Sequence, residues 1–397
     1  MHALLTAVAL VLALAAAGCG SGDQDRRPAG PRVQPPPGGH PLDRLGPAED
    51  RLDLVAPPGY AEDAWVSDFE TRTGCGVTVR TARDPGQLLS LLSTGRYDGA
   101  GAPSEVMLQL IAEGRVAPIN RALVRGYRDV AEGLRDRPST TIDGRLYGVP
   151  QGRSATLLAY RRDRIPGTLS RSDAVFELPQ LVPYRGATTA AAGHMAIADA
   201  AVWLAANREE LEITNPYELD ERQFRAALRV LRQQREFLGT TWTNADEAAA
   251  AFLEQDAVQG LVPQGAVLRM RAQRPGVAIA ATLPREGTTG ESLHWVVASR
   301  ARHPSCMYRW IGHALSPTVQ AEVAEHTGDA PANLRACQFT RDREFCDAVR
   351  AADEGHWDRV ALRATPLRDC GDDRGAVCKT REEWVAGWRS VAMTPTG

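Results

Sequence analysis

Cysteines are the residues of this 397-residue sequence that offer the clearest chemistry. Neither a CxxC pair nor a Cys/His pair at metal-ligand spacing occurs, so the pattern argues against a zinc site. Once the most N-terminal cysteine is set aside, an even number remains, which predicts disulfides in an exported chain. The disulfide candidates are Cys75, Cys306, Cys337, Cys346, Cys370 and Cys378.

Spacing ranks the pairings of these cysteines. Cys370 and Cys378 enclose the short loop CGDDRGAVC, and we expect them to pair. Two alternatives stay open for the others, namely Cys306 with Cys337 or Cys337 with Cys346, and the remaining cysteine has no evident partner.

Motifs of common enzyme classes are missing from the sequence. His303 and His313 are too far apart for one helical face, and no HExxH occurs. The GxSxG elbow of serine hydrolases, a GxGxxG loop and a phosphate-binding P-loop are missing as well. We therefore expect no enzyme activity, no cofactor and no metal.

Composition and charge limit which classes of protein remain possible. A hydrophobic content of 43% is ample for a packed core, and the length predicts two domains or one two-lobed body. The formal net charge of -3 provides no basic footprint for nucleic acid, so we expect no nucleic-acid partner.

The N-terminus carries an export signal. Residues 3–18 form an apolar run that is shorter than the roughly 20 residues of a spanning helix, as in the apolar region of a signal peptide. Small residues precede Cys19, which resembles the lipobox of bacterial lipoproteins and predicts removal of residues 1–18 and acylation of the cysteine. The Pro/Gly-rich residues 19–50 then form a tether. An ordinary cleaved signal followed by a structural cysteine is the alternative.

Strands and helices alternate after this segment. Residues 51–60 predict a strand that ends in a Pro–Gly turn. Residues 62–82 predict a helix that stops at Gly74, followed by a strand, and residues 85–119 repeat this pattern. Such alternation predicts an α/β fold, with a parallel or mixed sheet and helices on both faces.

Helix signals are strongest in the second half. Residues 220–238 open with Asp220 and Gln223 at capping-box spacing, and Leu238 continues the apolar face. Residues 316–328 predict a helix with serine at its N-cap and glycine beyond its end.

The order of these elements resembles one known family, the extracellular solute-binding proteins of ABC importers, and within it the spermidine/putrescine-binding proteins of bacterial lipoprotein type. The resemblance covers about residues 51–397. The stretches that carry it are FETRTGCGVTV, GRYDGAGAPSEVMLQLIAEGRVAPIN, DGRLYGVPQGRSATLLAYRRD, LPREGTTGESLHWVVASRARHP, WIGHALSPTVQAEVAEHTGDAPANLRAC and TPLRDCGDDRGAVCKTREEWVAGW.

The resemblance implies a two-lobed periplasmic-binding-protein fold (a Venus flytrap), in which each lobe is a mixed sheet flanked by helices. It implies that residues 51–152 and 292–355 form the first lobe. Residues 153–291 and 356–397, with the disulfide-bearing tail, would form the second.

The family also implies a function and partners. The protein would capture a small-molecule ligand by hinge closure and deliver it to an ABC permease and ATPase complex, because a ligand that touches both lobes stabilises the closed state. It would act as a monomer, held outside the cytoplasm at the outer face of the cell membrane, or in the periplasm, by a lipid on Cys19. The alternative is a secreted lipoprotein enzyme, or a sensor or scaffold without a transport role, on the same fold.

In the family, aromatic side chains and carboxylates hold a polyamine. The resemblance places Tyr60 and Ser104 at positions of the family's ligand site. Expected tryptophans fall on Pro57 and Pro263, and the sequence WxD is replaced by residues 291–293. Two expected acids of the second lobe fall on alanine and methionine within AAAGHM. We therefore expect weak or absent binding of spermidine.

Other polar residues in the matched segments are further ligand candidates. Glu291 is a ligand carboxylate or a solvated loop acid, and Glu105 is a ligand carboxylate or a helix N-terminal acid favoured by the helix dipole. Arg153, Gln264 and His294 are either hydrogen-bond donors to a ligand or structural residues.

Overall fold

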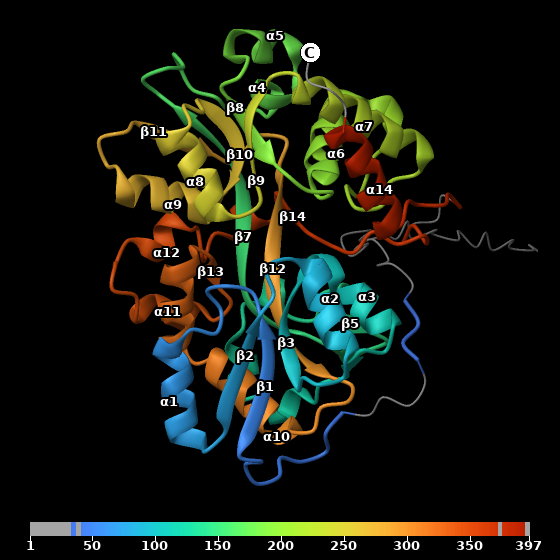
Figure 1. Ribbon diagram of the computed structural model, residues 1–397, viewed down its shortest axis with the longest axis vertical. Coiled ribbons are helices and arrows are strands. Elements are labelled where there is room, and N and C mark those ends of the chain that lie inside the picture. Colours follow the sequence, from blue (N-terminus) through green and yellow to red (C-terminus); the bar gives the residue numbers. More distant parts are fainter. Residues whose placement is uncertain (1–32, 37–40, 372–374, 394–397) are drawn as a thin grey trace, which may run out of the picture.

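The structure of the protein is a computed structural model that describes residues 33–36, 41–371 and 375–393. Two halves are stacked along the long axis, and the strands β7 and β12 run through both of them (Figure 1). Cys19 and the predicted signal peptide lie outside the described residues.

The first half contains β1 (Arg51–Ala56), α1 (Asp63–Thr73), β2 (Gly76–Thr81), α2 (Pro85–Ser93), β3 (Gly99–Pro103), α3 (Ser104–Ala112), β4 (Val116–Ala117), β5 (Thr141–Ile142), β6 (Arg145–Leu146), α10 (Pro304–Ala314), α11 (Pro317–Thr327) and β13 (Ala330–Pro331). The second half contains α4 (Asp173–Phe176), α5 (Leu178–Leu181), β8 (Thr188–Ala191), α6 (Ala196–Asn207), α7 (Glu221–Arg235), β9 (Leu238–Trp242), α8 (Ala245–Glu254), β10 (Gln259–Pro263), α9 (Gln264–Gln273), β11 (Ile279–Thr282) and α14 (Arg381–Ala392). The connecting elements are β7 (Val149–Arg161), β12 (Thr288–Ala298), α12 (Phe345–Ala348), α13 (Glu354–Trp357) and β14 (Val360–Leu362). Single-turn 3-10 helices lie at Arg121–Leu123, Tyr127–Asp129, Glu132–Leu134, Val182–Tyr184, Glu209–Leu211 and Leu334–Gln338.

One mixed sheet links the two halves. Its strand order is β2-β1-β3-β12-β7-β10-β8-β9. The N-terminal part of β7 pairs with β12, and its C-terminal part pairs with β10 and β11, so the strand belongs to both halves. This arrangement confirms the expected α/β class and the two-lobed architecture.

Alternation along single strands explains why helices cover both faces of each half. In β1, Leu54 packs with the α1 and α10 side, whereas the adjacent Val55 packs with the α2 and α3 side. In β10, Leu261 packs toward α6, α7 and α14, and Val262 packs toward α8 and α9. Four apolar clusters, two for each half, result from this pattern.

Local signals placed several helix ends correctly. The capping box of Asp220 and Gln223 is formed in both directions at the start of α7. Gly74 and Gly328 end α1 and α11 with positive φ angles of 73° and 83°, a conformation that glycine adopts without strain. The extension of α7 to Leu238 was wrong, because this helix ends at Arg235 and β9 begins at Leu238.

Three disulfides join the six cysteines beyond Cys19. Cys370–Cys378 confirms the predicted pair, and Cys337–Cys346 is one of the two pairings that the sequence left open. The alternative pairing of Cys306 with Cys337 was wrong, because Cys306 in the first turn of α10 lies beside the α1–β2 turn and bonds to Cys75.

Residues 41–50, which belong to the predicted tether, lie against α10. The carboxylate of Glu49 accepts hydrogen bonds from the backbone N–H groups of Ser305 and Cys306 at 3.0 and 2.7 Å. The Nη2 atom of Arg309 donates to the carbonyl of Gly46 at 2.7 Å. The chain is therefore attached to the first half before β1 begins.

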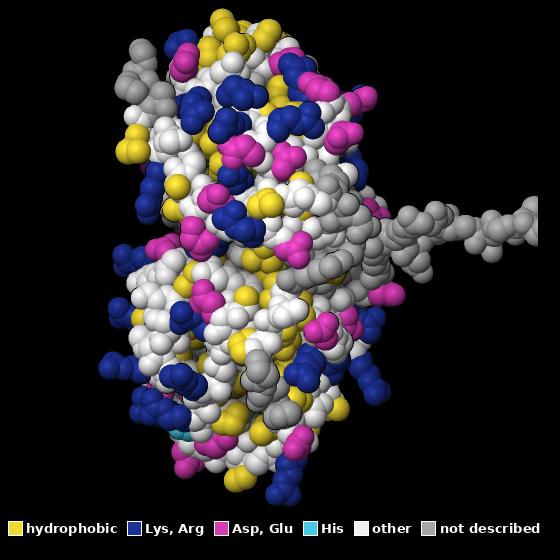
Figure 2. All heavy atoms as spheres, turned by 90° about the vertical axis from the view of Figure 1, so that its right-hand side faces the viewer, with side chains coloured by type: hydrophobic (Ala, Val, Ile, Leu, Met, Phe, Trp, Pro, Cys, Tyr) yellow, Lys and Arg dark blue, Asp and Glu magenta, His cyan; other side chains and the backbone are white. Residues whose placement is uncertain are grey.

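The outer face around α7 and α14 mixes both signs of charge (Figure 2). Arg225 pairs with Glu221 one turn earlier on α7, and Lys379 pairs with the same glutamate at 2.5 Å. Among the described residues, none of the helices combines the length and the apolar composition that crossing a bilayer requires.

Candidate functional site

Arg363 is the central residue of the candidate site. It directly follows β14, and its N–H donates to the carbonyl of Gly290 at 2.8 Å, so its backbone continues along β12. Its Nη1 atom lies 3.3 Å from Oε2 of Glu291 and 3.7 Å from Oε2 of Glu105. One guanidinium is therefore shared by two carboxylates from different elements.

Glu105 brings the first half to this guanidinium. It lies in the first turn of α3, and only 4% of its side chain is exposed. From the second half, Nε2 of His194 lies 3.9 Å from Oε1 of Glu105. The contact joins the two halves directly.

Asp199 of α6 adds a third carboxylate. Thr289 of β12, two residues before Glu291, donates its hydroxyl to Oδ1 of Asp199 at 2.5 Å. Tyr217 donates its hydroxyl to the carbonyl of Ala361 at 2.7 Å, two residues before Arg363. The interlobe cluster, as we use the term below, consists of Glu105, His194, Asp199, Tyr217, Glu291 and Arg363.

Burial shifts the pKa values of the cluster acids upward. It raises the pKa of Glu105 and of Glu291 against the opposing effect of Arg363. It raises the pKa of Asp199 from 3.8 to about 6. For Arg363, burial lowers the pKa, but the three carboxylates outweigh it and raise the pKa above its ordinary value. Three carboxylates therefore act on the Arg363 guanidinium, and Arg381 is the other guanidinium whose charge reaches Glu105.

His194 responds to the same surroundings in the opposite direction. Burial, with Arg381 and Arg363 nearby, lowers its pKa from 6.5 to about 4. At neutral pH the imidazole is therefore uncharged, and it gives Glu105 no second positive partner.

Tyr60 and Asp329 form a second polar pair beside the cluster. The Tyr60 hydroxyl donates to Oδ2 of Asp329 at 2.5 Å. Burial raises the pKa of both groups, and the negative charge of Glu291 raises both further. Glu291 is therefore close enough to act electrostatically on Tyr60 and Asp329 as well as on Arg363. It keeps 43% of its side chain exposed.

Two predicted residues make hydrogen bonds to the backbone. Ser104 is buried, and its hydroxyl accepts from the N–H of Ser292 at 3.4 Å. Gln264 is buried between the N–H of Ala155, at 3.3 Å, and the carbonyl of Gly328, at 2.9 Å. Their polar atoms join elements within the protein.

Arg153 and His294 are also engaged within the protein. The Nη2 atom of Arg153 lies 2.9 Å from Glu354, and its guanidinium lies over the Trp357 ring, 4.2 Å from the ring centroid. His294 is buried beside Ser292, and burial lowers its pKa to about 3. The structure thus brings together Glu105, Glu291 and Tyr60, and it ties the other predicted residues to structural contacts.

Several residues of the interlobe cluster, and Asp329 of the pair with Tyr60, were missed from the sequence. Arg363 follows a strand of three residues, too short to leave a pattern. Asp329 stands directly after Gly328, in a stretch that already carried the family resemblance. His194 lies within AAAGHM, between the alanine and the methionine on which the two expected acids fall, and Asp199 lies five residues after His194. His194 and Asp199 could have been found by asking which polar residues lie near the two replaced acids.

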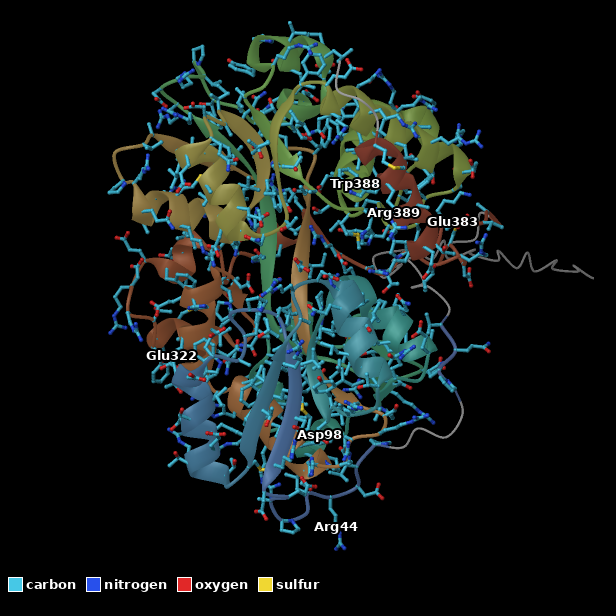
Figure 3. All side chains as sticks on the ribbon, in the orientation of Figure 1. Arg44, Asp98, Glu322, Glu383, Trp388 and Arg389 are labelled. Carbon is cyan, nitrogen blue, oxygen red and sulfur yellow. A yellow bond between two sulfur atoms is a disulfide. The ribbon has the colours of Figure 1, made fainter. Side chains whose placement is uncertain are left out.

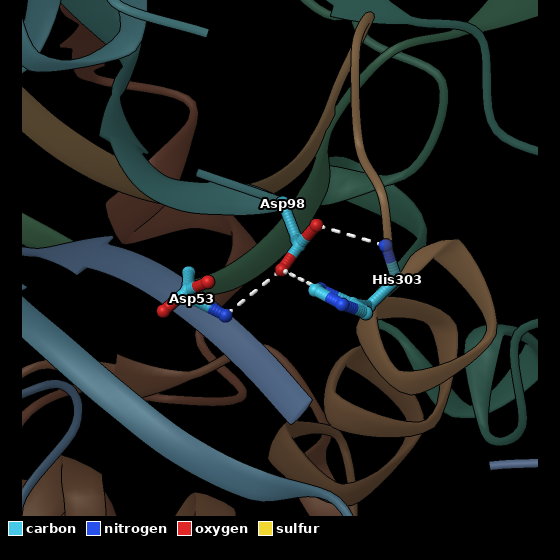
Figure 4. A group of neighbouring side chains, drawn as sticks. All are labelled: Asp53, Asp98 and His303. Atoms are coloured by element: carbon cyan, nitrogen blue, oxygen red, sulfur yellow. Dashed lines mark hydrogen bonds and ion pairs between the residues drawn. The ribbon is translucent and has the colours of Figure 1, made fainter. Parts of the chain in front are cut away.

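A third group of titratable side chains, Asp53, Asp98 and His303, lies at the base of the first half (Figure 4). The Asp98 carboxylate accepts from the N–H groups of Asp53, Arg302 and His303 and pairs with Nδ1 of His303, at 2.8 to 2.9 Å. These contacts satisfy the carboxylate, so the group joins β1 and β3 to the start of α10.

Two cavities lie away from the interlobe cluster. One, of about 490 Å³, lies between α6 and the start of β12, and its lining includes Val202 and Glu286. The other, of about 400 Å³, lies between α9 and α12, and its lining includes Leu268 and His356. Neither is lined by Glu105, Glu291 or Arg363.

Comparison with known proteins places this geometry in context. Residues 64–345 match the family model described as bacterial extracellular solute-binding protein. A putative spermidine/putrescine ABC transporter from Listeria monocytogenes has a similar structure, with a TM-score of 0.70 at 14% identity over 87% of this chain and 99% of that chain. A spermidine/putrescine substrate-binding protein from Streptococcus pneumoniae gives 0.68 at 13% identity over 86% and 97%. A lipoprotein of Treponema pallidum gives 0.67 at 15% identity over 86% and 99%. These three likenesses show the shared fold.

Proposed function

Because the chain belongs to the bacterial extracellular solute-binding protein family, we propose that it captures a small amine-bearing solute between its two lobes. It then delivers this solute to an ABC permease and ATPase complex. The structurally similar proteins from Listeria and Streptococcus are described as handling spermidine and putrescine, which are amines.

A surplus of acid between the lobes is the observation that carries this proposal. Carboxylates come from α3, α6, β12 and the loop after α11, namely Glu105, Asp199, Glu291 and Asp329. Arg363 and Arg381 are the guanidinium groups whose charge lowers the pKa of Glu105. A cationic ligand would offset the remaining negative charge, and contact with both lobes would favour closure.

Thermal shift and calorimetry with a solute panel test the proposal. The panel contains monoamines, amino acids, spermidine and organic anions at matched ionic strength. A ligand at 100 times its Kd stabilises the native state by about 2.7 kcal/mol. We expect stabilisation by a monoamine or an amino acid, its loss in Glu291→Gln, and weak or no stabilisation by spermidine. Saturable binding of organic anions alone would contradict the amine assignment.

We also propose that Cys19 is acylated after removal of residues 1–18 and that the protein works as a monomer outside the cytoplasm. The Treponema protein of the same fold is described as a lipoprotein. Metabolic labelling with a palmitate analogue in the native host would label the wild type, and Cys19→Ser would abolish the label. Labelling that persists in Cys19→Ser would contradict the anchor.

A further inference from the structure

The backbone that carries Arg363 is attached to both lobes. Its own N–H bonds to β12, and the carbonyl of Ala361 accepts from Tyr217 of the second lobe. Two residues after Arg363, the hydroxyl of Thr365 accepts a hydrogen bond from the N–H of Leu108 in α3 at 3.2 Å. The C-terminal segment runs between the α6 and α7 side and the α2 and α3 side in Figure 1. The guanidinium is therefore placed by fixed backbone.

The Arg363 side chain fills the space between the two carboxylates. Only 18% of the side chain is exposed, and its Nη1 atom is within ion-pair distance of both Glu105 and Glu291. A buried carboxylate without a cation is strongly unfavourable, so Glu105 requires this contact.

Glu105 nevertheless has unused acceptor capacity. None of the described residues donates a hydrogen bond to its carboxylate, although 96% of the side chain is buried. Arg363 and the uncharged His194 lie 3.7 and 3.9 Å from its oxygens, and Arg381 is a further guanidinium whose charge lowers its pKa. A buried acid held only at these distances is the type of group that a small ligand cation would contact if the guanidinium were removed.

We propose that Arg363 is a built-in cation that occupies the position a second ammonium group of a diamine would take between Glu105 and Glu291. It thereby restricts the ligand to solutes with a single amine, held on the side of Glu291 that faces Asp329. A ligand ammonium placed directly beside the Arg363 guanidinium would meet repulsion between like charges. The inference rests on the proposed function and specifies the ligand class of that site.

Replacement of Arg363 tests the inference. We would titrate two variants, Arg363→Ala and Arg363→Gln, with putrescine and with butylamine, its single-amine counterpart. The glutamine side chain is neutral, and it is longer than that of alanine. We expect putrescine to bind at least about tenfold more tightly to both variants than to the wild type, a difference well above calorimetric error. Butylamine should gain less than putrescine, because its single ammonium cannot contact both Glu105 and Glu291. Arg363→Lys keeps a cation in place and should not gain putrescine binding.

Two further variants control this experiment. Arg389→Ala removes an exposed arginine of α14, labelled in Figure 3, and should retain the wild-type profile. Arg363→Ala combined with Glu105→Gln should lose the gained putrescine binding. Circular dichroism establishes which variants are folded, and Arg363→Gln gives the result if the alanine variant does not fold.

The outcomes separate this inference from the proposed function. If the wild type binds a monoamine and neither folded variant gains putrescine binding, the inference fails and the function stands. If a variant gains putrescine binding while the wild type binds no amine, Arg363 does occupy an ammonium position, but the single-amine ligand class fails together with the proposed function. Equal putrescine binding by wild type and variants, or loss of the wild-type ligand in both variants, would overturn the inference. In the latter case Arg363 would itself be a ligand contact.

Discussion

Asp199 and His194 are partly buried members of the interlobe cluster, and their pKa values move in opposite directions. Burial raises the pKa of the Asp199 carboxyl and lowers that of the His194 imidazole. Linkage converts each shift into a pH dependence of the free energy of unfolding, with opposite signs over nearly the same pH range. In wild type the two pH dependences of the free energy of unfolding partly cancel. Substitution of one residue therefore reveals the pH dependence that comes from the other.

For Asp199, the pKa is about 6 in the folded state against an ordinary value of 3.8. Between these values the folded state binds more protons than the unfolded state, so the contribution of Asp199 to stability falls as the pH rises. Asp199→Asn keeps an acceptor for Thr289 and removes this fall. We expect the Tm of the variant minus that of the wild type to grow from pH 4 to pH 6 and then to level off. A difference independent of pH would contradict the shift.

For His194, the folded-state pKa of about 4 lies below the ordinary value of 6.5. The unfolded state binds more protons between these values, so the contribution of His194 to stability rises with pH. In His194→Gln, we expect the Tm relative to wild type to fall as the pH rises from 4 to 6.5. Differential scanning fluorimetry in matched buffers measures this, and a trend of the same sign as that of Asp199→Asn would refute it.

At the scale of elements, local sequence signals predicted what local contacts determine. Gly74 ends α1 because its positive φ angle needs no distant partner, and the Asp220 capping box is complete within four residues. The short Cys370–Cys378 loop was predictable for the same reason. In contrast, Cys75 and Arg363 acquire their partners through the packing of α10 against α1 and of β14 against β12, which no short pattern in the sequence encodes.

The disulfides provide a prediction at this scale. The Cys75–Cys306 bond joins residues 231 positions apart in the sequence, and the Cys370–Cys378 bond joins residues 8 positions apart. In the chain-entropy description, removal of the first costs about 5.5 kcal/mol of unfolding free energy and removal of the second costs about 2.5 kcal/mol. Paired Cys→Ala variants under non-reducing denaturation should show this order, and equal losses would contradict the loop-length account.

At the scale of the whole molecule, three chain connections join the two lobes. β7 and β12 pass through both lobes, and the segment after β14 contacts α3 through Thr365 and α7 through α14. The candidate site lies where the third connection meets the other two. The two-lobed outline followed from the order of strands and helices. The chemistry of the site did not, because its residues come from segments that are distant in sequence.

Closure provides the prediction at this scale. The Arg363 guanidinium links Glu105 of the first lobe to residues from β12 and the second lobe, so its loss should favour separation of the lobes. We expect small-angle X-ray scattering to give a larger radius of gyration for ligand-free Arg363→Ala than for ligand-free wild type. Arg389→Ala serves as the control. Identical radii for all three proteins would show that the guanidinium does not hold the lobes together.

The attachment of residues 41–50 to α10 has a mechanical consequence. The Glu49 carboxylate is bonded at the start of α10, and Val33 packs into the apolar cluster of α2 and α3, so both contacts lie on the first lobe. A membrane attachment N-terminal to these residues would exert force on the first lobe alone. The second lobe would remain free to rotate about the hinge. Closure on a solute would then require no displacement of the membrane attachment.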